Sequence, residues 1–222
     1  MSEIKKTLYE GKEFVIQQEG TEIVAITKKT ATEYSRLDMK TKKAVHWYAR
    51  KICDRIYYHY RDFDRRLNIC CLGSAMGAIP FELLNKYPNA EITCVDIDYE
   101  SLYILEHSIL KPFANRVVYE QMNAKDFVKE LEPNEFDIII NDLFSEQTTP
   151  PFVHTSSFLR DVFRGLDSHK HESTKGLYFA NTITDTFEFT HGIAIEKIGY
   201  VVERFTKRPE GVANIVYEVS KS

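Results

Sequence analysis

The stretch Leu67–Asp98 constrains the fold of this 222-residue chain more than any other feature. It begins with a short apolar run, Leu67–Leu72, followed by a turn that contains Gly73 and Gly77. A helix-like segment then leads into a second apolar run, Ile92–Val95, which is followed at once by acidic residues. An apolar strand, a glycine turn, a helix and another apolar strand predict a βαβ unit, whose two strands lie parallel in one sheet.

Apolar runs and helix-like segments continue to alternate downstream of this unit. Phe136–Ile140 is nearly all apolar, as expected of a strand that is buried on both faces. Gly176–Asn181 has a similar composition, and Val201–Thr206 with Ala213–Val219 predicts a closing antiparallel pair. The whole pattern predicts an α/β fold with a seven-stranded, mostly parallel sheet and an antiparallel last strand.

The N-terminal part of the chain has a different pattern. Two short strand-like runs, Phe14–Ile16 and Ile23–Ile26, are separated by a glycine turn and predict a β-hairpin. We therefore expect a hairpin extension in residues 1–34 and the main domain in residues 35–222. Since a small exposed hairpin seldom stays unpaired, we also expect two copies to form a homodimer through it.

Composition and charge exclude several classes of protein. With 43% hydrophobic and 28% charged residues and a net charge of −4, the chain is typical of a globular domain. No apolar run approaches the roughly 18 residues that cross a bilayer, and the N-terminus lacks the core of a signal peptide. The cysteines lack metal-ligand spacing and are interpreted as reduced core residues: Cys53, Cys70, Cys71 and Cys94. These features predict a cytoplasmic protein with no membrane partner and no metal.

Glycines and an acid together mark a candidate nucleoside site. Gly73 and Gly77, at a strand-to-helix turn, allow the backbone to come close to a ligand, and the helix N-terminus adds outward N–H groups. Asp96 directly follows the second strand, where a carboxylate can hold ribose hydroxyls. Asp98 is expected to cap the next helix. The alternative is that the two glycines serve only tight packing.

At these residues the chain resembles a known family. Leu72–Pro80 followed by Val95–Asp98 resembles motif I and the acidic motif of class I S-adenosylmethionine-dependent methyltransferases, most closely their spermidine-synthase-like branch. Phe136–Asp142 and Pro150–Phe158 resemble a later strand and the loop that follows it in that branch. The resemblance covers residues 35–219 and implies a Rossmann-like domain that binds S-adenosylmethionine or decarboxylated S-adenosylmethionine.

The resemblance also implies roles for individual residues. The turn residues Gly73, Ala75 and Gly77 would lie against the cofactor, and Asp96 would bind its ribose. Asn123 stands where the family usually has an aspartate that binds the adenine amino group, and an amide oxygen can still accept that bond.

One position carries the implied catalytic role. Asp142 stands where aminopropyltransferases keep the aspartate that orients and deprotonates the attacking amine. Tyr34, Asn141 and Phe144 are its expected neighbours. The alternative is that Asp142 caps a turn into the loop around Ser145.

Departures from the family pattern decide the preferred activity. Met76 stands where spermidine synthases have an aspartate in the glycine-rich turn, and Ser145 replaces their second catalytic-loop acid. We therefore expect a methyltransferase acting on an amine or hydroxyl acceptor. A polyamine aminopropyltransferase using decarboxylated S-adenosylmethionine is the first alternative, and a non-catalytic nucleoside-binding subunit is the second.

The acceptor itself is expected to be a small molecule or a protein. Basic and aromatic residues between Lys40 and Arg66 provide an alternative, because together they could form a footprint for RNA. We prefer the interpretation that this stretch is a solvated polar helix face whose aromatic side chains pack inward.

Overall fold

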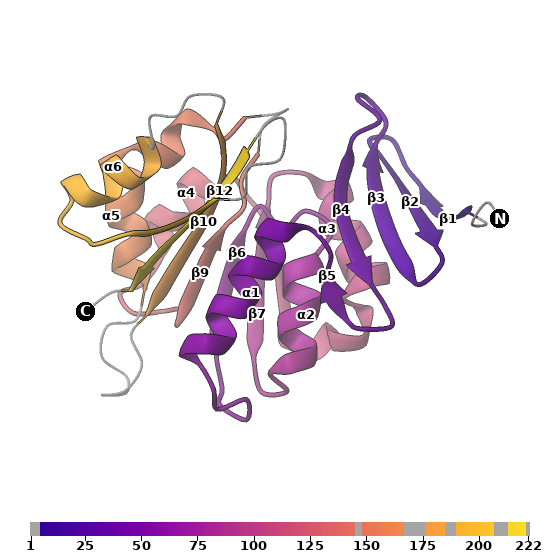
Figure 1. Cartoon of the computed structure of the whole chain (residues 1–222), viewed down its shortest axis with the longest axis horizontal. Helices are drawn as coiled ribbons and strands as arrows, with labels where there is room; N and C mark the ends of the chain where they lie inside the picture. The colour runs from indigo at the N-terminus through magenta and orange to yellow at the C-terminus, as the bar shows by residue number, and fades with distance from the viewer. Residues whose placement is uncertain (1–4, 145–147, 167–175, 185–189, 207–212, 221–222) are drawn as a thin grey trace.

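Seven strands form the main sheet in the described part of the chain, in the order β11-β12-β10-β9-β6-β7-β8. The computed structural model describes residues 5–144, 148–166, 176–184, 190–206 and 213–220 (Figure 1). Strands β6 to β10 pair in parallel, and β12 lies antiparallel between β10 and β11. This confirms the predicted sheet. Its strands are β6 (Asn68–Leu72), β7 (Glu91–Asp96), β8 (Val117–Gln121), β9 (Ile138–Asn141), β10 (Leu177–Thr184), β11 (Glu203–Thr206) and β12 (Ala213–Ser220).

Helices cover both faces of the main sheet, and each face has its own apolar core (Figure 1). One face carries α1 (Trp47–His59), α2 (Ala78–Lys86) and α3 (Tyr99–Ile104), and the other carries α4 (Ala124–Glu130), α5 (Ser156–Gly165) and α6 (Thr190–Lys197). Cys70 packs in one core and Cys71 in the other, as expected of neighbours in a strand. All four cysteines are buried and free, which confirms their interpretation as core residues.

Two helices differ from what sequence periodicity predicts. Apolar residues recur at helical spacing from Thr41 to Tyr60, yet α1 begins at Trp47, because Lys43–Ala44 forms strand β5 and pairs with β4 (Glu33–Asp38). The pattern over Glu100–Leu110 predicts one helix, but after Ile104 the helix changes into a π-helical turn, Leu105–Ile109. This wider turn brings Leu105, Ile109 and Leu110 together against Gly77.

The N-terminal extension is an antiparallel sheet with strand order β1-β2-β3-β4-β5 (Figure 1). Its strands are β1 (Lys5–Glu10), β2 (Phe14–Glu19), β3 (Glu22–Thr27), β4 (Glu33–Asp38) and β5 (Lys43–Ala44). The predicted hairpin is present as β2 and β3, but three further strands extend it, and the predicted boundary after residue 34 falls inside β4. The strands β1 and β4 lack a clear apolar alternation, which is why the pattern alone did not reveal them.

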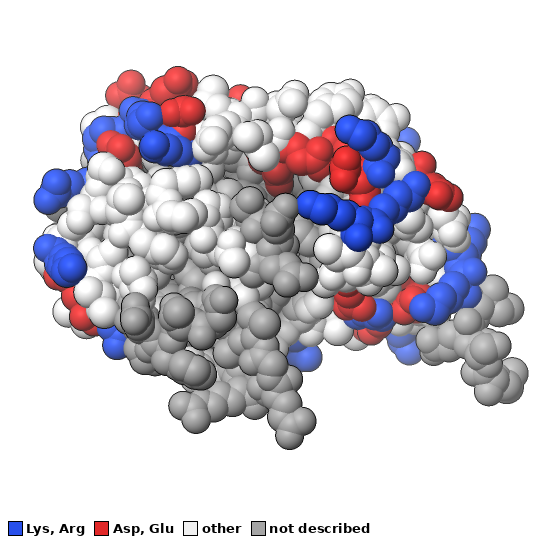
Figure 2. Space-filling view, turned by 90° about the horizontal axis from the view of Figure 1, so that it is seen from above, with Lys and Arg blue, Asp and Glu red and all other residues white. Residues whose placement is uncertain are grey.

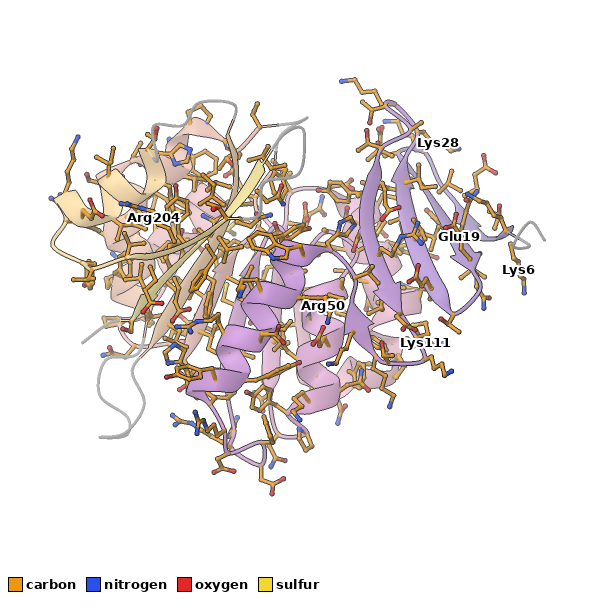
Figure 3. The ribbon with its side chains drawn as sticks, in the orientation of Figure 1. Lys6, Glu19, Lys28, Arg50, Lys111 and Arg204 are labelled. Atoms are coloured by element: carbon orange, nitrogen blue, oxygen red, sulfur yellow. The ribbon has the colours of Figure 1, made fainter. Side chains whose placement is uncertain are left out.

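A single arginine ties β2, β3 and β4 together. Arg36 donates to Glu19 at 3.0 Å, to Glu22 at 2.5 Å and to Glu33 at 2.7 and 2.8 Å. Glu19 lies on the N-terminal sheet in Figure 3, where Lys5 also contacts it at 2.6 Å. Hydrogen bonds from Lys5 and Arg36 hold the pKa of Glu19 below its ordinary value. Glu33 and Arg36 of β4 therefore belong to a charged cluster, a role that sequence periodicity does not show.

Three of the basic residues between Lys40 and Arg66 pair with acids of the main domain: Arg55, Arg65 and Arg66. Arg55 contacts Glu218 at 2.5 and 2.8 Å, and Arg66 contacts Glu91 at 2.9 Å. In the space-filling view from the top of Figure 1, acidic and basic side chains lie next to one another on the described part of the face (Figure 2). These ion pairs within the chain engage part of the basic stretch, and both the polar helix face and the nucleic-acid footprint stay predictions.

Helices of the described segments are all too short or too polar to cross a membrane. Ser145 lies outside the described residues.

Candidate functional site

The turn between β6 and α2 combines three residues with positive φ angles. These angles are 76° at Gly73, 46° at Ala75 and 70° at Gly77. A Cβ atom on Gly73 would lie 2.6 Å from the carbonyl oxygen of Asp142, and one on Gly77 would lie 2.5 Å from Leu105. Both glycines are therefore needed for close packing, as the alternative interpretation held, and their contact with a cofactor stays a prediction.

Asp96 ends β7 beside this turn. Its carboxylate accepts a hydrogen bond from the Asp98 N–H at 3.0 Å, and backbone N–H groups of Ala75 and Ile97 also donate to it. Burial raises the pKa of Asp96 to about 6, although the backbone hydrogen bonds from Ala75, Ile97 and Asp98 lower it. At neutral pH the side chain is thus a partly desolvated carboxylate that further donors, such as a pair of hydroxyls, would stabilise.

Asp98 has the capping role expected of it. Its carboxylate accepts hydrogen bonds from the backbone of Glu100 and Ser101 at 3.2 and 3.0 Å, and from the Ser101 hydroxyl at 2.7 Å. It is the N-cap of α3, and the prediction is confirmed.

A cavity of about 230 Å³ brings several predicted site residues together. Gly73, Asp96 and Asn123 line it. Its other walls are mostly apolar: Val95, Ile97, Met122, Leu143, Phe144, Pro150 and Phe152. Ile97 is 68% exposed and contributes apolar surface to this lining. A few polar groups among apolar walls suit a flat heterocycle joined to a sugar.

Asn123 also has a structural role that the sequence analysis did not assign. Its side-chain oxygen accepts the Lys125 N–H at 2.9 Å and so caps α4. One lone pair of the oxygen and both amide hydrogens stay available to a ligand. The residue lines the cavity, and its role in binding a ligand stays a prediction.

Asp142 follows β9 and is buried, with 8% of its surface exposed. The Asn181 side chain donates to its Oδ1 at 2.8 Å, and the Tyr48 hydroxyl gives a further hydrogen bond. Burial raises the pKa of Asp142 to about 7, while these two donors act in the opposite direction. A carboxylate that titrates near neutral pH can both accept and hold a proton there.

Tyr48 and Asn181 were missed as site residues. Tyr48 occupies an apolar position in the helical pattern of α1, and this pattern gives no sign that its hydroxyl reaches Asp142. Asn181 lies in the strand next to Asp142, at the register position after Ala180, which pairs with Asn141. A polar residue near the carboxyl end of a buried parallel strand was a signal that could have identified Asn181.

Of the three expected neighbours of Asp142, two lie in the cavities. Tyr34 and Phe144 line both the cavity beside Asp96 and a second one. Burial and the nearby carboxylates of Asp96 and Asp142 raise the pKa of Tyr34. Asn141 has a different environment, because its amide donates to the Tyr178 hydroxyl at 2.9 Å in the core.

The second cavity has a volume of about 420 Å³ and lies between the N-terminal sheet and the loop after β9. Its aromatic lining is Phe14, Tyr34 and Phe144, and its polar lining is Glu13, Thr27, Lys29, Thr30 and Asp98. Because Tyr34 and Phe144 line both cavities, the two are neighbours. A cofactor in one cavity would therefore lie next to a molecule in the other.

Residues 60–166 match the family model described as the Methyltransferase small domain. The fold is that of the class I methyltransferases. A comparison with curated protein sequences gives no match.

Solved structures with the same fold include two spermidine synthases. A probable spermidine synthase from Corynebacterium glutamicum is 22% identical, with a TM-score of 0.80 over 99% of this chain and 81% of that chain. A spermidine synthase from Thermotoga maritima is 13% identical, with a TM-score of 0.64 over 98% of this chain and 73% of that chain. A precorrin-6y C5,15-methyltransferase from Geobacter metallireducens is 16% identical, with a TM-score of 0.58 over 78% of this chain and 88% of that chain.

The solved structures differ in how much of this chain they match. A match to 98–99% of the chain must include the N-terminal sheet, whereas a match to 78% cannot include all of the chain's elements. The N-terminal sheet is therefore an architectural feature shared with the spermidine synthases.

Proposed function

We propose that the protein is a transferase that uses S-adenosylmethionine or its decarboxylated form, with methyl transfer to an amine or hydroxyl acceptor preferred. The observation that carries the proposal is the buried Asp142 carboxylate, whose pKa is about 7, beside the glycine turn. Asp142 thus lies at the carboxyl ends of parallel strands, where α/β folds bind their ligands.

The cofactor would occupy the cavity beside Asp96. Asp96 would accept hydrogen bonds from the ribose hydroxyls, and Asn123 would contact the base between the apolar walls. When bound, the cofactor supplies an electrophilic carbon on a positively charged sulfur, and transfer breaks that C–S bond as the acceptor's lone pair forms a new one. Proximity and alignment account for much of the rate of such a displacement.

Asp142 would receive the proton that the acceptor loses. Tyr48 and Asn181 hold its carboxylate in place. The Oδ1 atom of Asn181 is buried and has no hydrogen-bond partner among the described residues. An amine has N–H groups for both Asp142 and Asn181, whereas a hydroxyl has one hydrogen to donate. This arrangement supports an amine acceptor, whose body would enter the cavity beside Phe14.

The glycine turn supports methyl transfer over aminopropyl transfer. Met76, where spermidine synthases have an acid, is 4% exposed and packs in the apolar core. In the described residues the turn therefore offers no carboxylate for the ammonium group of an aminopropyl chain. Aminopropyl transfer stays the second candidate, because the N-terminal sheet is shared with the spermidine synthases.

Calorimetric titration with S-adenosylmethionine, decarboxylated S-adenosylmethionine and methylthioadenosine tests the proposal. We expect S-adenosylmethionine, which keeps its carboxylate, to bind most tightly. The Asp96→Ala substitution should abolish the binding of all three compounds. Asp126→Ala is the matched control, since Asp126 lies on an exposed face of α4 and pairs with Lys129. A preference for the decarboxylated compound would place aminopropyl transfer first, and failure of all three to bind would refute the proposal.

A further inference from the structure

One carboxylate of the main domain accepts three hydrogen bonds from the turn between β1 and β2. Glu100 lies in the first turn of α3. Its Oε2 accepts the N–H groups of Lys12 and Glu13 at 3.1 and 3.0 Å, and its Oε1 accepts the Phe14 N–H at 3.2 Å. Hydrogen bonds to an ionised group are stronger than neutral ones. Glu100 therefore fastens the N-terminal sheet to the main domain.

The turn is shaped for this contact. A Cβ atom on Gly11 would lie 1.9 Å from Glu100 Oε1 and 2.6 Å from the Tyr9 ring. Gly11 does not have a positive φ angle, so its backbone conformation is open to other residues. Glycine is needed at this position because the carboxylate comes so close.

The residues that Glu100 holds line the larger cavity. Glu13 and Phe14 belong to its walls, and the Phe14 ring lies 5.5 Å from the Tyr34 ring. Tyr34 in turn lines the cavity beside Asp96. A shift of the β1–β2 turn would therefore move the wall that faces the candidate cofactor site.

Asp96, the last residue of β7, is joined to Glu100 in α3 by the short connector Ile97–Asp98. The Asp98 N–H donates to Asp96 Oδ1 at 3.0 Å, and Asp98 Oδ1 accepts the Glu100 N–H at 3.2 Å. Hydrogen bonds thus continue from Asp96 through Asp98 to Glu100 and then to the turn. Each hydrogen bond in this series is 3.0 to 3.2 Å long.

We infer that Glu100 is a positioning residue that holds the N-terminal wall of the larger cavity to the connector that follows Asp96. A ligand on Asp96 and an ordered β1–β2 turn then stabilise each other through Glu100. The inference rests on the proposed function only for the identity of that ligand.

Amide hydrogen exchange of residues 12–14 in the full chain tests the contact directly. We expect exchange of these amides to be at least about tenfold faster in Glu100→Ala and in Gly11→Ala than in the unchanged protein. Glu106→Ala is the matched control, because Glu106 is an exposed acid in the π-helical turn that continues α3. Among the described residues its ion pair is with the neighbouring His107. Equal exchange in the unchanged protein and Glu100→Ala would overturn the inference.

The conservative variant guards against misfolding. Glu100→Gln keeps one oxygen acceptor, so it can retain the bonds from Lys12 and Glu13 and lose the one from Phe14. We expect its exchange to lie between those of the unchanged protein and Glu100→Ala. Exchange as fast as in Glu100→Ala at all three amides would contradict the assigned hydrogen bonds.

Added S-adenosylhomocysteine tests whether Glu100 couples ligand binding to the β1–β2 turn or only holds the turn in place. In the unchanged protein it should slow exchange at residues 12–14 by a further factor of about 5. In Glu100→Ala it should still bind and leave exchange at these residues unchanged. The same slowing in both proteins would overturn the positioning role. If the unchanged protein does not bind this probe, the proposed function fails, and the ligand-free comparison still decides whether Glu100 holds the turn.

Discussion

At the scale of single residues, the environment of Asp142 matters most. An exposed aspartate is ionised at neutral pH and is a weak base. Burial changes this by raising the pKa of Asp142 to about 7, while Asn181 and Tyr48 keep the carboxylate oriented. The side chain can therefore take up a proton in the pH range in which most enzymes work.

The first prediction concerns transfer by Asp142→Asn. We expect the rate to fall by about 10²- to 10⁴-fold, since the amide cannot accept the acceptor's proton. Transfer by the unchanged protein should rise as pH increases through about 7, because the ionised form of Asp142 is the base. Transfer of labelled methyl groups to a panel of primary amines measures both effects. An undiminished rate in Asp142→Asn, with Asp126→Asn as control, would refute the catalytic role.

The second prediction concerns stability and pH. Between the ordinary pKa of 3.8 and about 7, folded Asp142 holds a proton that the unfolded chain has released, so stability falls as pH rises. The shift corresponds to an upper bound of about 4 kcal/mol. Asp142→Asn carries no charge, so relative to the unchanged protein it should gain stability at pH 8 and lose that gain toward pH 4. Urea unfolding at several pH values measures the gap, and a gap independent of pH would contradict the buried titration.

At the scale of elements, the turn between β6 and α2 is the most constrained segment. Gly73 and Gly77 adopt positive φ angles at little cost, whereas Ala75 does so against the preference of an L-residue. The N–H of Ala75 also donates to Asp96. The strained residue is thus kept in a conformation that supports the candidate ribose ligand.

The third prediction follows from this strain. Ala75→Gly should leave stability unchanged or raise it by up to about 1 kcal/mol, because relief of the positive φ angle offsets the entropy that glycine loses on folding. The same substitution at Ala49, inside α1, should lower stability by about 1 kcal/mol. Thermal or urea unfolding of both variants gives the comparison. Equal losses at the two positions would show that Ala75 is unstrained.

At the scale of the whole molecule, the N-terminal sheet weakens the reason for expecting a homodimer, which was that an exposed hairpin needs a partner. A lone hairpin would need a partner, but five paired strands with a buried face satisfy most of their own hydrogen bonds. The strand β1 is the outer edge, and it carries Lys6, whose charge opposes edge-to-edge pairing, whereas Lys5 is paired with Glu19. The homodimer stays a prediction, with β1 as the edge through which it would form.

The fourth prediction is tested by sedimentation equilibrium across a wide range of concentrations. If β1 pairs with a second copy, the apparent mass should approach twice the 25.9 kDa of one chain as concentration rises. Raised salt should strengthen the association, because it screens the repulsion between the Lys6 side chains of the two copies. A constant mass of one chain would rule the homodimer out.

The candidate site was predictable only in part. Asp96 and Asp142 could be found because each directly follows a buried strand, and parallel strands bring such residues to one edge of the sheet. Tyr48 could not be found in the same way, because whether a helix turns a hydroxyl toward a carboxylate depends on how the helix packs. The roles of Gly73 and Gly77 also needed the structure, since their neighbours Asp142 and Leu105 are distant in sequence.

The sequence alone predicts the strands and helices of the main domain, its parallel sheet with the antiparallel last strand, and the acids at the ends of β7 and β9. These features follow from local periodicity and from the geometric rules for connecting parallel strands. The tertiary structure is needed to find the size of the N-terminal sheet, the donors around Asp142 and the contact of Glu100 with the β1–β2 turn. Each of these depends on atoms that folding brings together from separate parts of the chain, and no local pattern encodes where such atoms meet.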